Sequence, residues 1–138
     1  MYLEYADLIN GAYEEDLLVL QRHEANALRA IEDAMGEAKS FLARRYNMDS
    51  EYAKTGENRN AYLVKIIRDI ALYNIYTIAH PSQMNDTRRL RYEDARRFLE
   101  QVYNKKADLA GLEVNETDTG GGSYIVIGES NTKRNNGD

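Results

Sequence analysis

The stretch RNAYLVKIIRDIALYNIYTIAH, residues 59–80, decides the fold, and the only proline of the chain, Pro81, follows it directly. Eight of its residues recur at the three-and-four spacing of an α-helix: Leu63, Ile66, Ile67, Ile70, Ala71, Asn74, Ile75 and Ile78. Val64 and two tyrosines widen this apolar arc, and a helix so apolar packs against several neighbours. We therefore predict a central core helix about 33 Å long, with its few charges at the surface or at a subunit contact.

The segments on either side predict an all-α fold, a four- to five-helix bundle. Helical patterns cover residues 5–10, 13–21, 24–46 and about 86–103, whereas residues 47–58 lack periodicity and are predicted to be a loop. The expected helix ends are Asn58 or Asn60 as one N-cap, Asp86 or Thr87 as another, and Asn104 as a left-handed stop. Gly36, inside a predicted helix, is expected to mark a close helix crossing.

The composition changes near residue 113, which divides the chain into a helical domain, residues 1–112, and a C-terminal arm, residues 113–138. The arm is rich in Asn, Thr, Asp and Gly and should be flexible. It contains one β-prone run that is too short to form a sheet alone, with Tyr124, Ile125, Val126 and Ile127 at its centre. This run either adds to a strand edge of a partner protein or of this chain, or it remains disordered. We expect it to become ordered only in the assembled particle.

The net charge of −5 is unevenly distributed. Residues 1–37 carry a net charge of −7, residues 38–110 of +5 and residues 111–138 of −3. An acidic front and a basic middle can meet head to tail between neighbouring subunits. The acidic residues predicted for that contact are Glu14, Glu15 and Asp16. Ordinary solvated helix faces would give the same charge pattern.

The most basic segment is RRLRYEDARR, residues 88–97, and three interpretations of it stay open. Its guanidinium groups could form a protein interface, or they could bind nucleic acid. Glu93 and Asp94 could instead pair with them along the helix and leave an ordinary solvated face. The arginines predicted to belong to an interface are Arg88, Arg89, Arg91, Arg96 and Arg97.

Catalytic and metal-binding patterns are not apparent in the sequence. There is no cysteine, and the two histidines, His23 and His80, do not form the Glu-x-x-His pairs of carboxylate-bridged metal sites. The glycines at 120–122 lack the Lys-Ser/Thr pair of a phosphate-binding loop. We expect no enzyme activity, no cofactor and no metal. Charges interrupt every apolar run and no signal peptide is apparent, so we expect a soluble intracellular product.

Taken in order, several segments resemble a known family. They are YLEYADLINGAY and EEDLLVL, then ALRAIEDAMGEAKSFLARRYN, then LVKIIRDIALYNIY, and finally RRLRYEDARRFLEQV with NKKADLAGL. Together they resemble the small helical head–tail connector (adaptor) proteins of tailed phages, in their Mu-like branch, over residues 1–112. Members of the family often carry proline after the Arg-Tyr pair, where this chain has Asn47. Residues 113–138 match no pattern of the family.

The resemblance implies a structural virion protein without catalysis. Such proteins are similar in fold to a four- to five-helix bundle and assemble as a ring, typically of twelve copies, beneath the portal protein. The ring extends the DNA channel, does not bind DNA sequence-specifically, and docks the tail or a stopper protein. The implied location is the head–tail interface of the virion, after synthesis in the host cytoplasm. The alternative is a small DNA-binding or DNA-packaging accessory protein that uses residues 88–97. A third and weaker alternative, a helical enzyme or ligand-binding bundle, has no nameable active residues.

Overall fold

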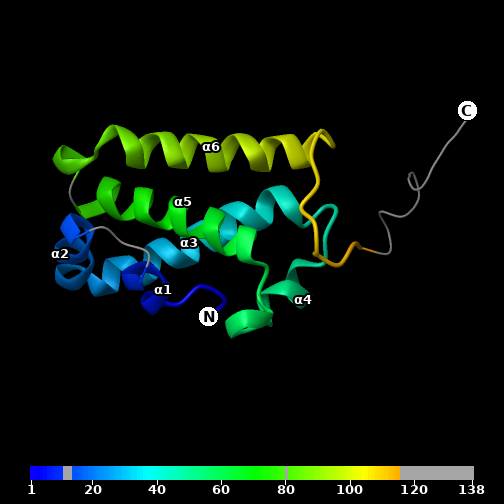
Figure 1. Cartoon of the computed structure of the whole chain (residues 1–138), viewed down its shortest axis with the longest axis horizontal. Coiled ribbons are helices and arrows are strands. Elements are labelled where there is room, and N and C mark those ends of the chain that lie inside the picture. Colours follow the sequence, from blue (N-terminus) through cyan, green and yellow to red (C-terminus); the bar gives the residue numbers. More distant parts are fainter. Residues whose placement is uncertain (11–13, 80, 116–138) are drawn as a thin grey trace, which may run out of the picture.

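The computed structural model describes residues 1–10, 14–79 and 81–115, and within them the side chains of residues 14, 15 and 83 are not described. These ranges are helical and contain no strand, which confirms the prediction of an all-α helical bundle (Figure 1). The elements are α1 (Tyr5–Asn10), α2 (Glu14–Arg22), α3 (Glu24–Leu42), α4 (Met48–Tyr52), the 3₁₀ turn η1 (Gly56–Asn58), α5 (Ala61–Ala79), the 3₁₀ turn η2 (Pro81–Gln83) and α6 (Asp86–Tyr103).

Three long helices, α3, α5 and α6, form the body of the molecule, with α1 and α2 toward one end and α4 toward the other (Figure 1). Helix α5 packs on both other long helices, as expected of the central helix. Its buried residues are Leu63, Ile66, Ile67, Asp69, Ile70, Ala71, Leu72, Ile75 and Tyr76. Two expectations for this helix are wrong, because Ile78 is 45% exposed and the charged residue Asp69 is buried.

The buried face of α3 is built mainly from alanine. Ala27, Ala30, Ala34 and Ala38 are all fully buried, and Ile31 and Leu42 extend the same face. The expected close crossing at Gly36 is wrong, because this residue is exposed and a Cβ atom built on it meets no heavy atom within 4 Å. Nothing within the described part of the chain requires a glycine at this position.

Replacement of Gly36 by alanine is therefore expected to raise the free energy of unfolding by up to about 1 kcal/mol. Glycine in a helix interior loses more backbone entropy on folding than alanine, and the added methyl group meets open space. Urea denaturation followed by circular dichroism measures the change. A matched Ala30→Gly variant, at a buried site in the same helix, should be destabilised; a less stable Gly36→Ala variant would contradict the prediction.

Three of the helices have an asparagine side chain as their N-cap. The Oδ1 atoms of Asn47, Asn60 and Asn85 accept the backbone N–H groups of residues 50, 63 and 88 at 3.1, 3.0 and 2.8 Å. Asn60 was one of the two predicted caps of α5, whereas Asn85, not Asp86 or Thr87, caps α6. The loop predicted over residues 47–58 contains α4 and η1, since a five-residue helix is too short to show periodicity.

The left-handed residue after α6 is Lys105, not Asn104. Lys105 has φ = 63°, whereas Asn104 has φ = −86°. The N–H of Lys106 donates to the carbonyl of Gln101 at 2.7 Å, and that of Lys105 to the carbonyl of Val102 at 3.0 Å. These two bonds form a Schellman motif, in which glycine normally occupies the position of Lys105.

Residues 113–115 lie against the residues that follow α3. The carbonyl of Glu113 accepts the N–H of Asn47 at 2.8 Å, and the N–H of Asn115 donates to the carbonyl of Arg45 at 2.9 Å. These bonds form an antiparallel bridge between Tyr46 and Val114. Helix α3 ends at Leu42, four residues earlier than predicted, and residues 43–45 form a turn that leads into this bridge.

Candidate functional site

Two of the predicted interface residues, Asp16 and Arg88, form an ion pair inside the molecule. Each is only 2% exposed. The NH2 group of Arg88 donates to Oδ2 of Asp16 at 2.9 Å, and the Tyr76 hydroxyl donates to the other oxygen of this carboxylate. The pair therefore joins α2, α5 and α6. The expectation that these two side chains face another subunit is corrected, because each is enclosed by its own chain.

A second buried carboxylate, that of Asp69 on α5, completes the group. Its Oδ1 lies 3.8 Å from NH1 of Arg88, and its Oδ2 lies 3.0 Å from Nζ of the half-exposed Lys65. The Nε and NH1 groups of Arg88 make no hydrogen bond within the described residues. We call Asp16, Asp69, Tyr76 and Arg88 the buried charge network. One feature of the sequence could have indicated this network. Asp69 occupies a core position, between Ile66 and Ile70, and a buried carboxylate requires a cationic partner.

The outer arginines of α6 form ion pairs within the chain. Arg89 pairs with Asp86, and Arg97 with Asp94 at 2.8 Å. Arg96 lies 3.5 Å from a carboxylate oxygen of Glu37 on α3 and 3.6 Å from one of Glu100. Arg91 is half-buried. This arrangement favours the internally paired face among the three interpretations of residues 88–97, and an interface role of the exposed arginines stays a prediction.

The structure does not describe the side chains of the remaining predicted interface residues. Glu14 and Glu15 lie in the first turn of α2, as the pattern predicted, but only their backbone is described. Tyr124, Ile125, Val126 and Ile127 lie outside the described residues. The proposed strand addition by this segment therefore stays a prediction.

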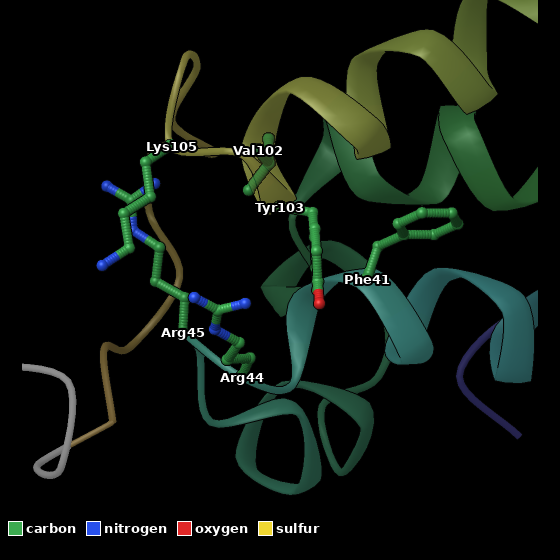
Figure 2. Close-up of a pocket in the computed structure, with 6 residues that line it drawn as sticks. All are labelled: Phe41, Arg44, Arg45, Val102, Tyr103 and Lys105. Carbon is green, nitrogen blue, oxygen red and sulfur yellow. The ribbon is translucent and has the colours of Figure 1, made fainter.

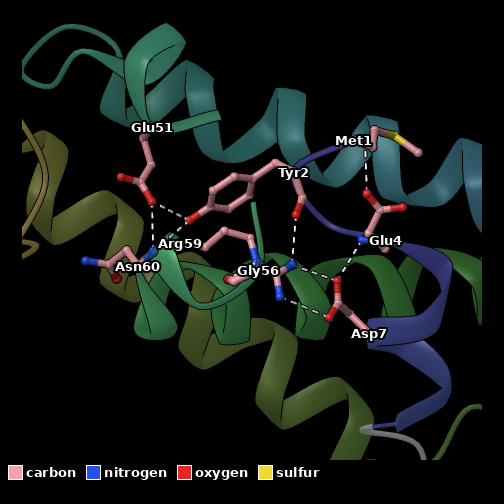
Figure 3. Close-up of polar contacts among 8 residues, drawn as sticks. All are labelled: Met1, Tyr2, Glu4, Asp7, Glu51, Gly56, Arg59 and Asn60. Atoms are coloured by element: carbon pink, nitrogen blue, oxygen red, sulfur yellow. Dashed lines mark hydrogen bonds and ion pairs between the residues drawn. The ribbon is translucent and has the colours of Figure 1, made fainter. Parts of the chain in front are cut away.

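A second polar cluster ties the N-terminus to the start of α5 (Figure 3). Both the hydroxyl of Tyr2 and the backbone N–H of Asn60 donate to Oε2 of Glu51, at 2.6 and 2.8 Å. The guanidinium of Arg59 binds both carboxylate oxygens of Asp7, at 2.7 and 3.2 Å, and the Tyr2 carbonyl at 2.9 Å. We call these five residues the N-terminal clasp. No periodic pattern predicts it, because its members come from the N-terminal segment, α1, α4 and the connection before α5.

The clasp lowers the pKa of two carboxyl groups. Burial alone would raise the pKa of Glu51, but the hydrogen bonds from Tyr2 and Asn60 outweigh it, and the net pKa lies below its ordinary value. Burial would likewise raise the pKa of Asp7, and the bonds from Arg59 bring it below its ordinary value. Burial and the neighbouring Glu51 carboxylate raise the pKa of Tyr2.

The clasp is expected to lose its stabilising effect in acid. The pKa values of Asp7 and Glu51 are lower in the folded than in the unfolded state, where they are about 3.9 and 4.3. Their contribution to stability is therefore complete above those values and is lost as the pH falls through the folded pKa values. The free energy of unfolding, measured by urea denaturation between pH 7 and pH 3, should fall below about pH 4. Glu51→Gln should make this fall shallower; an unchanged slope would contradict the assignment.

A cationic surface that the charge analysis did not single out lies where α3 and α6 end. Arg44, Lys105 and Lys106 are exposed, and none of them forms an ion pair within the described part of the chain. The guanidinium carbon of Arg44 lies 5.0 Å from the centre of the Tyr103 ring, and this ring packs edge-on against Phe41 (Figure 2). We call Arg44, Lys105 and Lys106 the basic corner.

The hollow beside the basic corner is very small. The hollow shown in Figure 2 has a volume of about 10 Å³, room for no more than one water molecule. Beside it, NH1 of Arg45 donates to the Ala107 carbonyl at 3.1 Å, and NH2 pairs with Asp108. Arg45 thereby fixes the segment after α6 and leaves the charges of the corner to face outward.

Comparison with known proteins places the chain. It matches the bacteriophage Mu Gp36 family over residues 2–127. The chain belongs to this family. This Gp36-family chain is therefore a phage protein, and its family points to a structural or assembly-related role. No curated protein and no solved structure is significantly similar to it.

The family match spans the buried charge network, the N-terminal clasp and the basic corner. It also extends beyond Asn115 into residues 116–127, past the end of the predicted helical domain. Within the described ranges of this Gp36-family chain, no group of three or more His, Cys, Asp or Glu side chains is arranged to hold a metal ion. No described helix is both long and apolar enough to span a membrane.

Proposed function

We propose that this chain is a head–tail connector subunit that assembles as a ring beneath the portal protein. In this role it extends the DNA channel and docks the tail or a stopper protein, without catalysis. Membership of the bacteriophage Mu Gp36 family over residues 2–127 is the observation that carries the proposal. This membership indicates a phage protein with a structural or assembly-related role. The more specific role of head–tail connector comes from the resemblance of residues 1–112 to the connector proteins.

The polar contacts that fix the helices against one another support this role. A ring subunit must hold its contact surfaces at fixed positions, because a rotation between neighbours closes a ring only at one angle. The buried charge network fixes α2 against α5 and α6, and the N-terminal clasp fixes α1 against the start of α5. Asn115, the last described residue of the chain, is bonded to the Arg45 carbonyl beside the basic corner. From their composition alone, we expect the residues that follow to serve as a tether for a neighbouring component.

Electron microscopy of the full chain mixed with the portal protein of the same phage tests the proposal. We expect rings on the portal vertex, and we expect the chain among the proteins of purified tailed particles. If neither rings nor portal-bound density form at any protein ratio, and the particles lack the chain, the proposal fails. Rings that form only on the portal would still support it, because the portal can act as template.

The alternative is a DNA-binding or packaging accessory protein that uses residues 88–97. It has less support, because Arg88, Arg89, Arg96 and Arg97 form ion pairs within the chain and the whole chain has a net charge of −5. An electrophoretic shift of duplex DNA at physiological salt that is lost in Arg89→Ala/Arg97→Ala would favour this alternative over the connector.

A further inference from the structure

Two exposed positions carry residues that make the isolated chain less stable. Gly36 lies in the middle of α3, where alanine would fit without any contact. Lys105 has φ = 63° in the Schellman motif, where glycine would avoid the steric cost of a left-handed side chain. Within the described chain, no contact of either residue explains its presence. Proteins accept such local losses of stability where function requires them.

The surroundings of these two residues carry opposite charges. Asp33 and Glu32 precede Gly36 by three and four residues, so they share its helix face. Both are exposed, and neither forms an ion pair within the described part of the chain. We call Glu32, Asp33 and Gly36 the acidic face. Lys105 belongs to the basic corner, whose three cations are likewise without a carboxylate partner.

We infer that the basic corner of one copy docks on the acidic face of the next copy. The inference rests on the proposed function, since it names the residues by which neighbours in the ring would meet. Glu32 and Asp33 would receive Arg44 and Lys105. The missing Cβ of Gly36 would leave room for these long side chains beside the helix backbone.

Geometry explains why the two surfaces join different copies. Asp33 lies nine residues before the end of α3 at Leu42, which is about 13 Å along the helix axis. The basic corner begins beyond that end, so the two surfaces lie at different places on one molecule. A contact between two different surfaces of identical chains is heterologous, the type of contact from which rings are built.

Two features prepare the corner for such a contact. Arg44 is held over the ring of Tyr103 and the backbone of Lys105 is fixed by the Schellman bonds, so less freedom is lost on binding. A second copy is also the partner that the charges favour. The exposed cations of the basic corner match the exposed carboxylates of the acidic face locally, although the net charge of the whole chain is −5.

Disulfide trapping tests the contact directly, because the chain has no native cysteine. Full-length Lys105→Cys is mixed with full-length Asp33→Cys under mild oxidation, with and without portal protein. We expect a mixed disulfide dimer on a non-reducing gel. The control pair is Glu57→Cys with Asp33→Cys, which places the thiol on an exposed residue of η1 outside the basic corner. Equal yields from the two pairs would overturn the inference.

Charge reversal supplies the second test. Arg44→Glu/Lys105→Glu and Glu32→Lys/Asp33→Lys should each raise the dissociation constant of self-association at least tenfold. An equimolar mixture of the two variants should restore association, since each corner then meets an oppositely charged face. If association is unchanged and only the binding of duplex DNA is lost, the corner serves nucleic acid and the inference fails.

Lys105→Gly separates a contact role from a role in folding. The change should raise the melting temperature of the monomer by about 3–6 °C, because glycine adopts the left-handed conformation without strain. It should at the same time weaken association. A rise in melting temperature with unchanged association would overturn the inference. If rings form but Lys105→Cys and Asp33→Cys give no mixed disulfide, this contact is wrong and the connector proposal stands. If the disulfide forms but no rings are found, the contact stands and the connector proposal fails.

Discussion

Replacing Arg88 with alanine is expected to lower the free energy of unfolding by about 3–5 kcal/mol. Arg88 is 2% exposed and lies between the buried carboxylates of Asp16 and Asp69, 2.9 and 3.8 Å away. Without it, both carboxylates stay buried, and among the described residues only Lys65, at the surface, forms an ion pair with Asp69. Urea denaturation at pH 7, followed by circular dichroism, measures the loss.

Two further variants show whether the loss comes from the buried charges. Arg89→Ala removes an exposed ion pair one residue away and should change stability by no more than about 0.5 kcal/mol. Asp16→Leu/Arg88→Met removes both charges of the buried pair together and should recover part of the lost stability, because a buried ion pair can be replaced by apolar side chains at little cost. A loss for Arg88→Ala no larger than that for Arg89→Ala would refute the assigned role.

Glu51→Ala should be the second most damaging change, with a loss of about 2–4 kcal/mol. The carboxylate of Glu51 accepts the Tyr2 hydroxyl and the Asn60 N–H, and its loss leaves both donors without their charged acceptor. The N-terminal residues should then detach from the start of α5. Hydrogen exchange of the Asn60 amide should become faster by at least tenfold, and urea denaturation should show the loss of stability.

The matched control for Glu51 is Glu57→Ala. Glu57 is an exposed glutamate in η1, and it forms no ion pair within the described residues. Its replacement should change the free energy of unfolding by no more than about 0.5 kcal/mol. If both glutamate variants lose the same amount of stability, the N-terminal clasp does not hold the N-terminus in the way described here.

The helices themselves could be predicted from local pattern. Helix α5 spans Ala61–Ala79 within the predicted residues 59–80, and α1 spans the predicted residues 5–10. Both segments carry their own periodicity and end signals, such as Pro81 and Gly11. Helix α3 was predicted too long, because residues 43–46 contain no helix breaker. What stops it is a bridge to residues 113–115, far along the chain.

The candidate sites were harder to predict, because burial of a charge depends on a distant partner. Asp16 and Arg88 are 72 positions apart, and each read alone looked like part of an exposed charged segment. Asp69 was the exception, since its place in the apolar arc could have indicated a buried carboxylate. Arg44 and Lys105 were visible only as ordinary basic doublets. What distinguishes them in the structure is the left-handed backbone at Lys105 and the ion pair that occupies Arg45, the neighbour of Arg44.

The long separations within the buried charge network and the N-terminal clasp set an order for folding during synthesis. Asn60 must emerge from the ribosome before Tyr2 finds its partners, and Arg88 must emerge before Asp16 does. The first 22 residues are therefore made first and docked late, after α3 and α5 can pair. We therefore expect the core surface that α2 covers to stay open until α6 is complete and Arg88 can bind Asp16.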